Sequence, residues 1–300
     1  KNIPILEPKY FDYIYWNNFK IRNGFASVKF DKIFLKKLKT YNNKKLKNKI
    51  SKFIHKRLYN KIKTNYTWSR DLKYSAKYKR KNNLSRYNSE TKVLIAPHAF
   101  SDASHVEGTD FLFTDYYEHF KETLDFIKKI RIKNVLWIVR PHPSGHLYGE
   151  KGIVERLVRS INYKNIILCP KNTSTVDMLN QCNVVITGRG TIALEAACCG
   201  KYTINAGPSI YSGFNFSLDP KTKYEYFKSI KNKKTFKKLN KSKINLAKSI
   251  LYYLEKDSPI WNEITLFNKA YDKREGKFKK KYSFMNNVSK KIEKKLFYRF

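Results

Sequence analysis

The sequence predicts an α/β fold whose centre is a Rossmann-like, doubly wound parallel sheet. Between residues 91 and 230, five short apolar runs alternate with stretches of helical periodicity. The runs are continuously apolar, which is typical of strands that helices bury on both faces. The same region is nearly balanced in charge, with 17 Lys and Arg against 13 Asp and Glu, so the rest of the chain holds 46 of the 63 basic residues. These observations place one α/β domain in the middle of the chain.

Each apolar run begins one strand–helix unit. The expected strands are VLIAP (93–97), NVLWIVR (134–140), NIILCP (165–170), NVVITG (183–188) and YTINAG (202–207). The expected helices cover about 111–131 and 151–161, the stretch after the suitable N-cap Ser174, TIALEAACCG with Gly200 at its end, and much of the basic chain beyond Thr222.

Two basic flanks adjoin this domain. The first is rich in Tyr, Phe, Lys and Asn, with helical spacing from Asp31 to Tyr59 and then a polar stretch that we interpret as a linker or irregular cover. The chain begins with Lys1 instead of Met, which leaves open whether it is a fragment that lacks an upstream domain. We expect three parts: an aromatic-rich basic portion (1–90), the Rossmann-like domain (91–255) and basic C-terminal helices (256–300).

The net charge of +39 lies almost entirely on the flanks. One interpretation is compositional drift, because Lys, Asn and Ile are abundant together. The other is attraction to a polyanion, which would be a nucleic acid, an anionic membrane surface or an acidic glycan. Nucleic acid is disfavoured, because no RNP-like, zinc-finger or helix-turn-helix signature accompanies the basic runs. Four cysteines in apolar surroundings, without metal-ligand spacing, favour reduced thiols in the cytoplasm.

Polar loops follow the five expected strands. Ligands of open parallel sheets bind at the carboxyl ends of the strands, so these loops should meet at one edge. The second strand ends in RPHPSG, where two prolines fix the backbone around Arg140, His142 and Ser144. A guanidinium, an imidazole and a hydroxyl at such a place suit a phosphate oxygen.

The loops after the third and fourth expected strands each precede a helix, and the first amide groups of a helix favour anions. Together with the two arginines Arg140 and Arg189 they predict a site for a nucleotide monophosphate or diphosphate. Glu195, one turn into the later helix, is expected either to bond a ribose hydroxyl or to cap the helix. The loop residues assigned to this site are Thr173, Ser174 and Thr175 in the first loop and Arg189, Gly190 and Thr191 in the second.

The loop after the first strand has a different chemistry. His98, Asp102, His105 and Glu107 lie close together in the sequence, but without the spacing of a helical metal site. We therefore expect no metal ion. Asp102 is the candidate base or nucleophile, with His98 to orient it, while His105 and Glu107 face the sugar or acceptor. The alternative is that Asp102 caps a turn and the histidines bond backbone carbonyls.

Four stretches of the sequence resemble one known group of proteins. They resemble bacterial capsule and surface-polysaccharide glycosyltransferases, with the Kdo transferases of capsule and lipopolysaccharide assembly as the nearest members. The resemblance covers roughly residues 93–215. The stretches are HAFSDASH (98–105), FTDYYEHFKETL (113–124), RPHPS (140–144) and TIALEAACCGK (191–201).

The resemblance implies a GT-B architecture, in which two Rossmann-like domains surround a cleft and the second binds the donor nucleotide. Residues 1–90 would then be a small or partial acceptor-side domain or a cover. By that likeness His142 contacts the donor phosphate, Thr191 and Glu195 belong to the nucleotide site, and His98 and Asp102 face the transferred sugar. No cofactor or metal is implied.

These features predict a metal-independent glycosyltransferase that uses a nucleotide-activated sugar, with CMP-linked Kdo or a related acidic sugar as the candidate donor. The acceptor would be a surface polysaccharide or a lipid-linked glycan, and the location cytoplasmic, with the Lys-rich flanks docked on the anionic inner membrane. Alternatives are a sugar-nucleotide epimerase or glycerophosphate transferase of the same fold, and a non-catalytic polyanion-binding protein. Inversion or retention, the linkage and the oligomeric state stay open.

Overall fold

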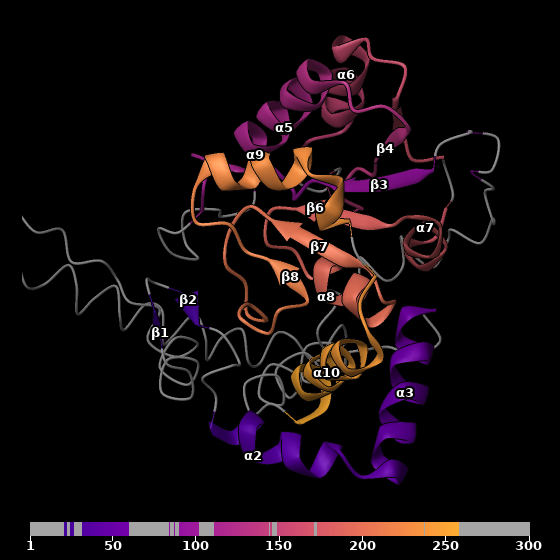
Figure 1. Ribbon diagram of the computed structural model, residues 1–300, viewed down its shortest axis with the longest axis vertical. Coiled ribbons are helices and arrows are strands. Elements are labelled where there is room, and N and C mark those ends of the chain that lie inside the picture. Colours follow the sequence, from indigo (N-terminus) through magenta and orange to yellow (C-terminus); the bar gives the residue numbers. More distant parts are fainter. Residues whose placement is uncertain are drawn as a thin grey trace, which may run out of the picture.

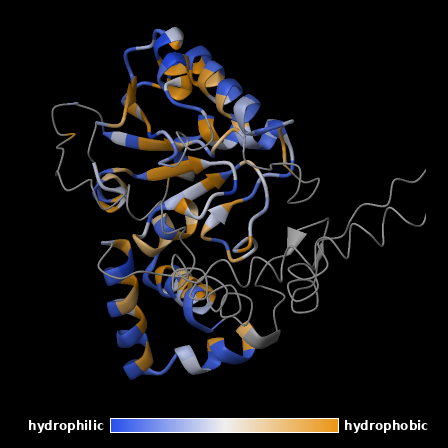
Figure 2. Cartoon of the chain, turned by 180° about the vertical axis from the view of Figure 1, so that it is seen from behind, coloured by the Kyte–Doolittle hydropathy of each residue, from blue (hydrophilic) through white to orange (hydrophobic). Residues whose placement is uncertain are grey.

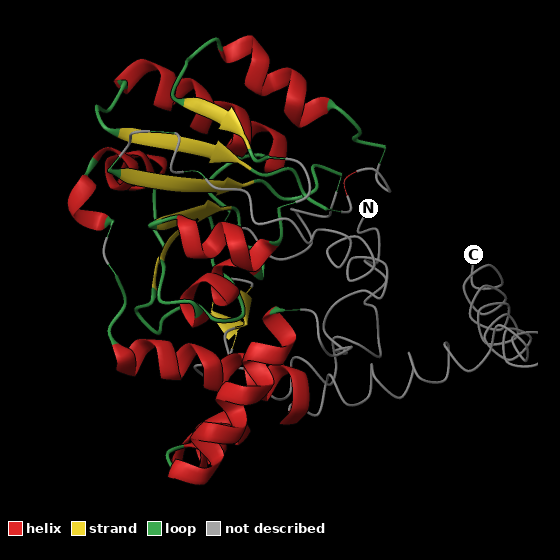
Figure 3. Cartoon of the chain, turned by 90° about the vertical axis from the view of Figure 1, so that its right-hand side faces the viewer, coloured by secondary structure: helices red, strands yellow, loops and turns green. Residues whose placement is uncertain are grey.

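The described part of the chain forms a six-stranded parallel sheet with helices on both faces (Figures 1 and 3). The structure is a computed structural model. It describes residues 21–22, 25–26, 32–59, 84, 87, 90–101, 111–143, 145, 149–170, 173–236 and 238–257.

The strand order is β5–β4–β3–β6–β7–β8, with all neighbouring strands parallel. Counted along the chain, this is the 3-2-1-4-5-6 order of a doubly wound sheet, so the predicted fold class is confirmed. Five of the six strands, β3 to β7, lie within the five predicted runs or begin just before them, whereas β8 was not predicted. The strands are β3 (Thr91–Ala96), β4 (Val135–Val139), β5 (Ile166–Leu168), β6 (Val184–Thr187), β7 (Tyr202–Asn205) and β8 (Ser217–Leu218).

Helices connect the strands and extend the structure beyond them. Residues 21–26 contain a small antiparallel pair, β1 (Ile21–Arg22) and β2 (Phe25–Ala26). The helices are α2 (Lys32–Tyr41), α3 (Lys44–Leu58), α5 (Tyr116–Ile130), α6 (Ile153–Ile161), α7 (Thr175–Gln181), α8 (Ile192–Cys198), α9 (Lys223–Lys231) and α10 (Lys241–Tyr252), with a 3₁₀ turn, η3 (Lys233–Thr235), and a π-helical end, η4 (Tyr253–Asp257).

The sheet is buried because alternate side chains point to opposite faces of a strand. In β4, Val135, Trp137 and Val139 pack with helices α5, α6 and α9, whereas Leu136 and Ile138 pack with α7 and α8. Both faces are therefore covered, and the central strands are largely hydrophobic (Figure 2). This is why the runs are apolar throughout instead of alternating.

A third hydrophobic core, besides the two on the faces of the sheet, joins the N-terminal helices to this domain. Buried side chains of α2 and α3, such as Phe34, Ile50 and Ile54, pack with α8 and α10. The predicted helical segment from Asp31 to Tyr59 is two helices, because Asn43 ends the first run and caps α3 by accepting from the amides of Lys45 and Leu46.

Capping side chains determine where the helices begin and end, and these boundaries differ in part from those that helical periodicity predicted. The helix expected from residue 111 begins at Tyr116, because Asp115 accepts from the amide of Glu118 at 2.7 Å and Glu118 accepts from the amide of Thr114 at 2.6 Å. The pattern resembles a capping box, except that Glu118 reaches the amide of Thr114, one residue before the N-cap Asp115. Ser174 is the N-cap of α7, as predicted, and Gly200 follows α8 with a φ of +77°, which a glycine adopts without strain.

Arg57 of α3 ties three elements together inside the third core. Its Nη1 lies 2.6 Å from Oε1 of Glu195 in α8, and its Nε lies 3.0 Å from Oε1 of Glu255 in η4. Burial alone would lower the pKa of Arg57, but the two carboxylates outweigh it and raise this pKa above its usual value. The group carries one positive and two negative charges, and its side chains are at most 12% exposed.

A second buried polar cluster links α5 to α9. The hydroxyl of Tyr226 lies 2.8 Å from Nε2 of His119 and 2.9 Å from Oγ1 of Thr123. The rings of Phe111 and Phe113 also contact His119. Burial, with a smaller contribution from His98, lowers the pKa of His119 to about 3. The imidazole is therefore neutral in the folded protein throughout the physiological range.

This pKa predicts a loss of stability in acid. Below about pH 6.5 the unfolded chain protonates His119 while the folded chain does not, so unfolding is favoured increasingly down to about pH 3, by up to about 1.4 kcal/mol per pH unit. His119→Gln, which cannot titrate, should flatten the pH dependence of the melting temperature between pH 6.5 and 4. The exposed His55→Gln on α3 serves as control. If the melting temperatures of the wild type and His119→Gln changed with pH in the same way, the low pKa of His119 in the folded protein would be contradicted.

Candidate functional site

The candidate site lies at the carboxyl edge of the sheet, where the strand order reverses. In the order β5–β4–β3–β6–β7–β8 the reversal falls between β3 and β6, which pair in register from Val93 with Val184 to Ala96 with Thr187. Loops that leave this point in opposite directions open a crevice, the usual ligand site of such sheets. His98 follows β3 and Gly190 follows β6, so the predicted site residues flank the switch point.

Three loops meet around His98. Its ring stacks on that of His142, from the loop after β4, with centroids 5.6 Å apart and planes at 19°. On the β6 side, a Cβ placed on Gly190 would lie 3.8 Å from Cδ2 of His98. The sequence prediction that these loops gather at one edge is therefore confirmed for His98, His142 and Gly190.

Aromatic side chains that the sequence did not single out complete this arrangement. The ring of Tyr116, at the start of α5, stacks on His98 with centroids 4.3 Å apart and planes at 16°. Phe111 meets Tyr116 edge to face at 5.0 Å. A Cβ on Gly188 would lie only 3.1 Å from the Tyr116 ring, so this glycine lets the ring approach the β6 loop. Tyr116 was predicted as helical but not as part of the site, since its spacing is that of a core residue.

Arg189 turns towards the loop after β7. Its guanidinium carbon lies 4.8 Å from the centroid of the Phe111 ring, and the side chain is only 5% exposed. A Cβ on Gly207 would lie 2.8 Å from Phe111 and 3.2 Å from Nη2 of Arg189, so residue 207 must be small. Arg189 thus forms a cation–π contact inside the edge of the site. Its predicted contact with phosphate stays a prediction.

Arg140 belongs to a second group of residues, on the side of β5. Its backbone amide donates to the carbonyl of Ile95, which continues the pairing of β4 with β3. Burial raises the pKa of the Cys169 thiol, while the charge of Arg140 and a hydrogen bond with Thr173 act in the opposite direction. Arg140, at the end of β4, therefore lies near Cys169 and Thr173, which follow β5.

The hydroxyl-rich loops are partly committed to local structure. Oγ1 of Thr173 donates to the carbonyl of Pro170 at 2.7 Å, and Oγ of Ser174 lies 2.6 Å from a carboxylate oxygen of Asp177 while capping α7. Thr191 begins α8 without a side-chain capping bond, and Thr175 is half-buried in the first turn of α7. Of the predicted hydroxyls in the described part of the chain, those of Thr191 and Thr175 are the least engaged in local hydrogen bonds.

Glu195 points away from solvent towards Arg57. The two alternatives for it were a ribose hydroxyl and a helix cap, and its 2.6 Å ion pair with Arg57 shows a third role that only the tertiary structure reveals. A ribose contact for its other oxygen stays a prediction.

Glu150 is a residue that the sequence prediction missed. This side chain is 7% exposed, and its Oε1 accepts from the backbone amide of Ser101 at 2.6 Å. Its own amide donates to the carbonyl of Gly145, and its Oε2 would contact a Cβ on that glycine at 3.5 Å. Glu150 therefore joins the loop after β3 to the loop after β4. No local pattern in GEKG marks it.

Part of the predicted site lies outside the described residues. Within the described part of the chain, the stack of His98, His142 and Tyr116 offers imidazole donors at the switch point, and Arg140 adds a cation two residues before His142. Such groups suit an anionic or hydroxyl-bearing ligand. The predicted residues outside this part are Asp102, Ser144, His105 and Glu107.

No model of a protein family and no curated protein matches the sequence. Solved structures with a similar fold include two of KpsC from Thermosulfurimonas dismutans. The β-Kdo 2,4-transferase is 15% identical, with a TM-score of 0.42, over 69% of this chain and 56% of that one. The β-Kdo 2,7-transferase is 16% identical, with a TM-score of 0.37, over 72% and 56%.

The wall teichoic acid polymerase TagF is also similar, at 12% identity and a TM-score of 0.36, over 63% of this chain and 45% of that one. The protein thus spans about half the length of these structures.

Proposed function

We propose that this chain is the donor-binding part of a glycosyltransferase that moves a sugar from a nucleotide-activated donor to a glycan or lipid-linked acceptor. The observation that carries the proposal is the meeting of the loops after β3, β4 and β6 around His98 at the switch point of the sheet. Two histidines and a nearby arginine there suit a nucleotide phosphate, and the sequence motifs favour a sugar nucleotide over other phosphates.

In this proposal His142 and Arg140 bind the phosphate of the donor and stabilise the charge that develops as the nucleotide departs. The rigid proline loop and the contact with His98 hold the imidazole of His142 in place before the donor arrives. Tyr116 and Phe111 exclude water from one side of the stack. His98 faces the transferred sugar, and Asp102 acts as the base or nucleophile. The candidate donor is CMP-linked Kdo or a related acidic sugar.

A thermal-shift panel of free nucleotides tests the binding step. A ligand that binds only the folded protein stabilises it by about 2.7 kcal/mol at one hundred times its Kd, so CMP should raise the melting temperature by several degrees. We expect UDP and CDP to raise it less. A transfer assay with CMP-, UDP- and CDP-linked donors then identifies the reaction.

The panel also separates the alternatives. Turnover of a UDP-sugar without any acceptor would favour the epimerase, and turnover of CDP-glycerol would favour the glycerophosphate transferase. If no nucleotide changes the melting temperature at millimolar concentration, the proposed function is wrong.

A further inference from the structure

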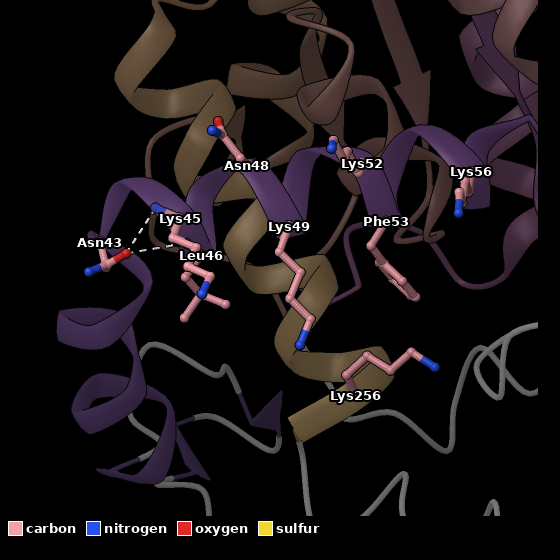
Figure 4. A pocket seen from close by; sticks show the side chains of 9 residues that line it. All are labelled: Asn43, Lys45, Leu46, Asn48, Lys49, Lys52, Phe53, Lys56 and Lys256. Atoms are coloured by element: carbon pink, nitrogen blue, oxygen red, sulfur yellow. Dashed lines mark hydrogen bonds between the residues drawn. The ribbon is translucent and has the colours of Figure 1, made fainter.

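A lysine-lined hollow lies beside α3 (Figure 4). Figure 1 shows α3 well away from β3 and β4, the strands whose following loops carry His98 and His142. The volume of the hollow is about 1040 Å³. Figure 4 shows the side chains of Lys49 and Phe53 extending from α3 towards Lys256 of η4. The described residues that line the hollow are Asn43, Lys45, Leu46, Asn48, Lys49, Lys52, Phe53, Lys56 and Lys256.

Four of these lysines form one stripe along α3. Lys45, Lys49, Lys52 and Lys56 are spaced at i, i+4, i+7 and i+11, so at 100° per residue they lie within about 60° of one another on the helix. At 1.5 Å per residue the stripe is about 16 Å long. All four side chains are exposed, and Lys256, also exposed, adds a fifth charge to the hollow.

The described acidic residues on either side of Lys256 are engaged elsewhere. None of the described lining residues is acidic. Of the residues beside Lys256, Glu255 binds Arg57 at 3.0 Å, and Asp257 binds Lys37 at 3.2 Å and the hydroxyl of Tyr41 at 2.5 Å. The five positive charges of the lining therefore act together on any ligand that enters.

The hollow also has an apolar part. Leu46 and Phe53 are half-buried beside the stripe, and Nζ of Lys256 lies 5.1 Å from the centroid of the Phe53 ring. An aromatic ring next to cations suits a ligand that combines negative charges with C–H-rich faces, as the rings of an acidic sugar chain do.

From this geometry we propose that the stripe and its hollow, named here the α3 track, bind an extended glycan chain that carries carboxylates. The inference deepens the proposed function and rests on it, because the bound chain would be an acidic acceptor held at a distance from the reaction centre. Successive charges of the chain lie along the lysines, and the sugar faces lie against Phe53.

An anionic membrane fits this surface less well. An interfacial helix inserts its apolar face among the lipids, but the apolar residues of α3, such as Ile50 and Ile54, are 2% and 1% exposed because they pack in the third core. A duplex nucleic acid would need a surface that it can lie on, whereas the charges here line a hollow. In the described part of the chain, each helix is too short or too polar to span a bilayer.

The test measures binding of oligogalacturonate, a carboxylate-bearing glycan, to the full chain by titration calorimetry at low salt and without nucleotide. The track variant changes Lys45, Lys49, Lys52 and Lys56 to Gln. The matched control changes four exposed lysines near α5 and α6 to Gln: Lys129, Lys133, Lys151 and Lys164. Both variants lose the same net charge, so a difference between them reports the site and not the overall field.

We expect the track variant to bind at least tenfold more weakly and the control to change less than twofold. Phe53→Leu should weaken oligogalacturonate binding about threefold while leaving inorganic polyphosphate binding unchanged, because only the sugar faces use the ring. Melting curves verify that each variant is folded. Equal losses in the two quadruple variants would overturn the proposal, and so would tighter, track-dependent binding to phosphatidylglycerol vesicles or duplex DNA than to oligogalacturonate.

The two proposals fail separately. If nucleotides stabilise the chain but oligogalacturonate does not bind through the track, the α3 track is wrong and the proposed function stands. If oligogalacturonate binds through the track and no nucleotide binds, the proposed function fails, and with it the reading of the bound chain as an acceptor.

Discussion

We expect Arg57→Met to lower the free energy of unfolding by about 3–5 kcal/mol, because it leaves the carboxylates of Glu195 and Glu255 buried without their cation. The side chain of Glu255 is fully buried and that of Glu195 is 12% exposed, so water cannot replace the guanidinium. Urea unfolding followed by circular dichroism measures the change at constant pH.

Two further variants determine whether charge is the cause. Arg159→Met removes an exposed arginine from α6 and should change the unfolding free energy by less than about 0.5 kcal/mol. The triple variant Arg57→Met, Glu195→Gln, Glu255→Gln removes all three charges and should recover much of the lost stability. An Arg57→Met protein as stable as the wild type would show that the ion pairs do not hold α3, α8 and η4 together.

His142→Ala should lower kcat/KM for sugar transfer by about ten- to a hundredfold, because a hydrogen bond to a charged phosphate contributes about 1.5–3 kcal/mol and the substitution also removes the stack on His98. Binding of the free nucleotide should weaken by about tenfold or more. The imidazole is half-buried at the surface of the site, so the melting temperature should fall by only a few degrees.

A variant that keeps a hydrogen-bond donor at position 142 tests whether His142 binds the phosphate. His142→Gln retains a side-chain N–H and should recover part of the lost nucleotide affinity, whereas His55→Ala, on the exposed side of α3, should behave as the wild type. Turnover by His142→Ala at the wild-type rate would remove this histidine from the mechanism.

Much of the central domain could be predicted because its signals are local. Continuous apolar runs indicate strands buried on both faces, and the predicted cap Ser174 and the terminating Gly200 act on their own helices. The loops at the strand ends followed, since parallel strands place their carboxyl ends at one edge. That is why His98 and His142 could be assigned to a common site before their contact was visible.

The sequence predictions failed at some element boundaries, for reasons that are also local. The predicted start of α5 was too early because helical periodicity does not show the capping hydrogen bonds that Asp115 and Glu118 accept from the amides of Glu118 and Thr114. The break between α2 and α3 was missed because Asn43 lies within a run of helix-forming lysines. The two-residue strand β8 is too short for a pattern to indicate it.

The sequence by itself determined the class of fold, the positions of the five main strands and the loops that carry the candidate site. Only the tertiary structure decided which side chains meet across the chain. Arg57 and Glu195 are 138 positions apart, and Tyr226 lies 107 positions from His119, so their pairing depends on how the helices pack on the sheet. Periodicity records that a residue is buried, but the partner of a buried polar group is set by the neighbours that packing brings to it.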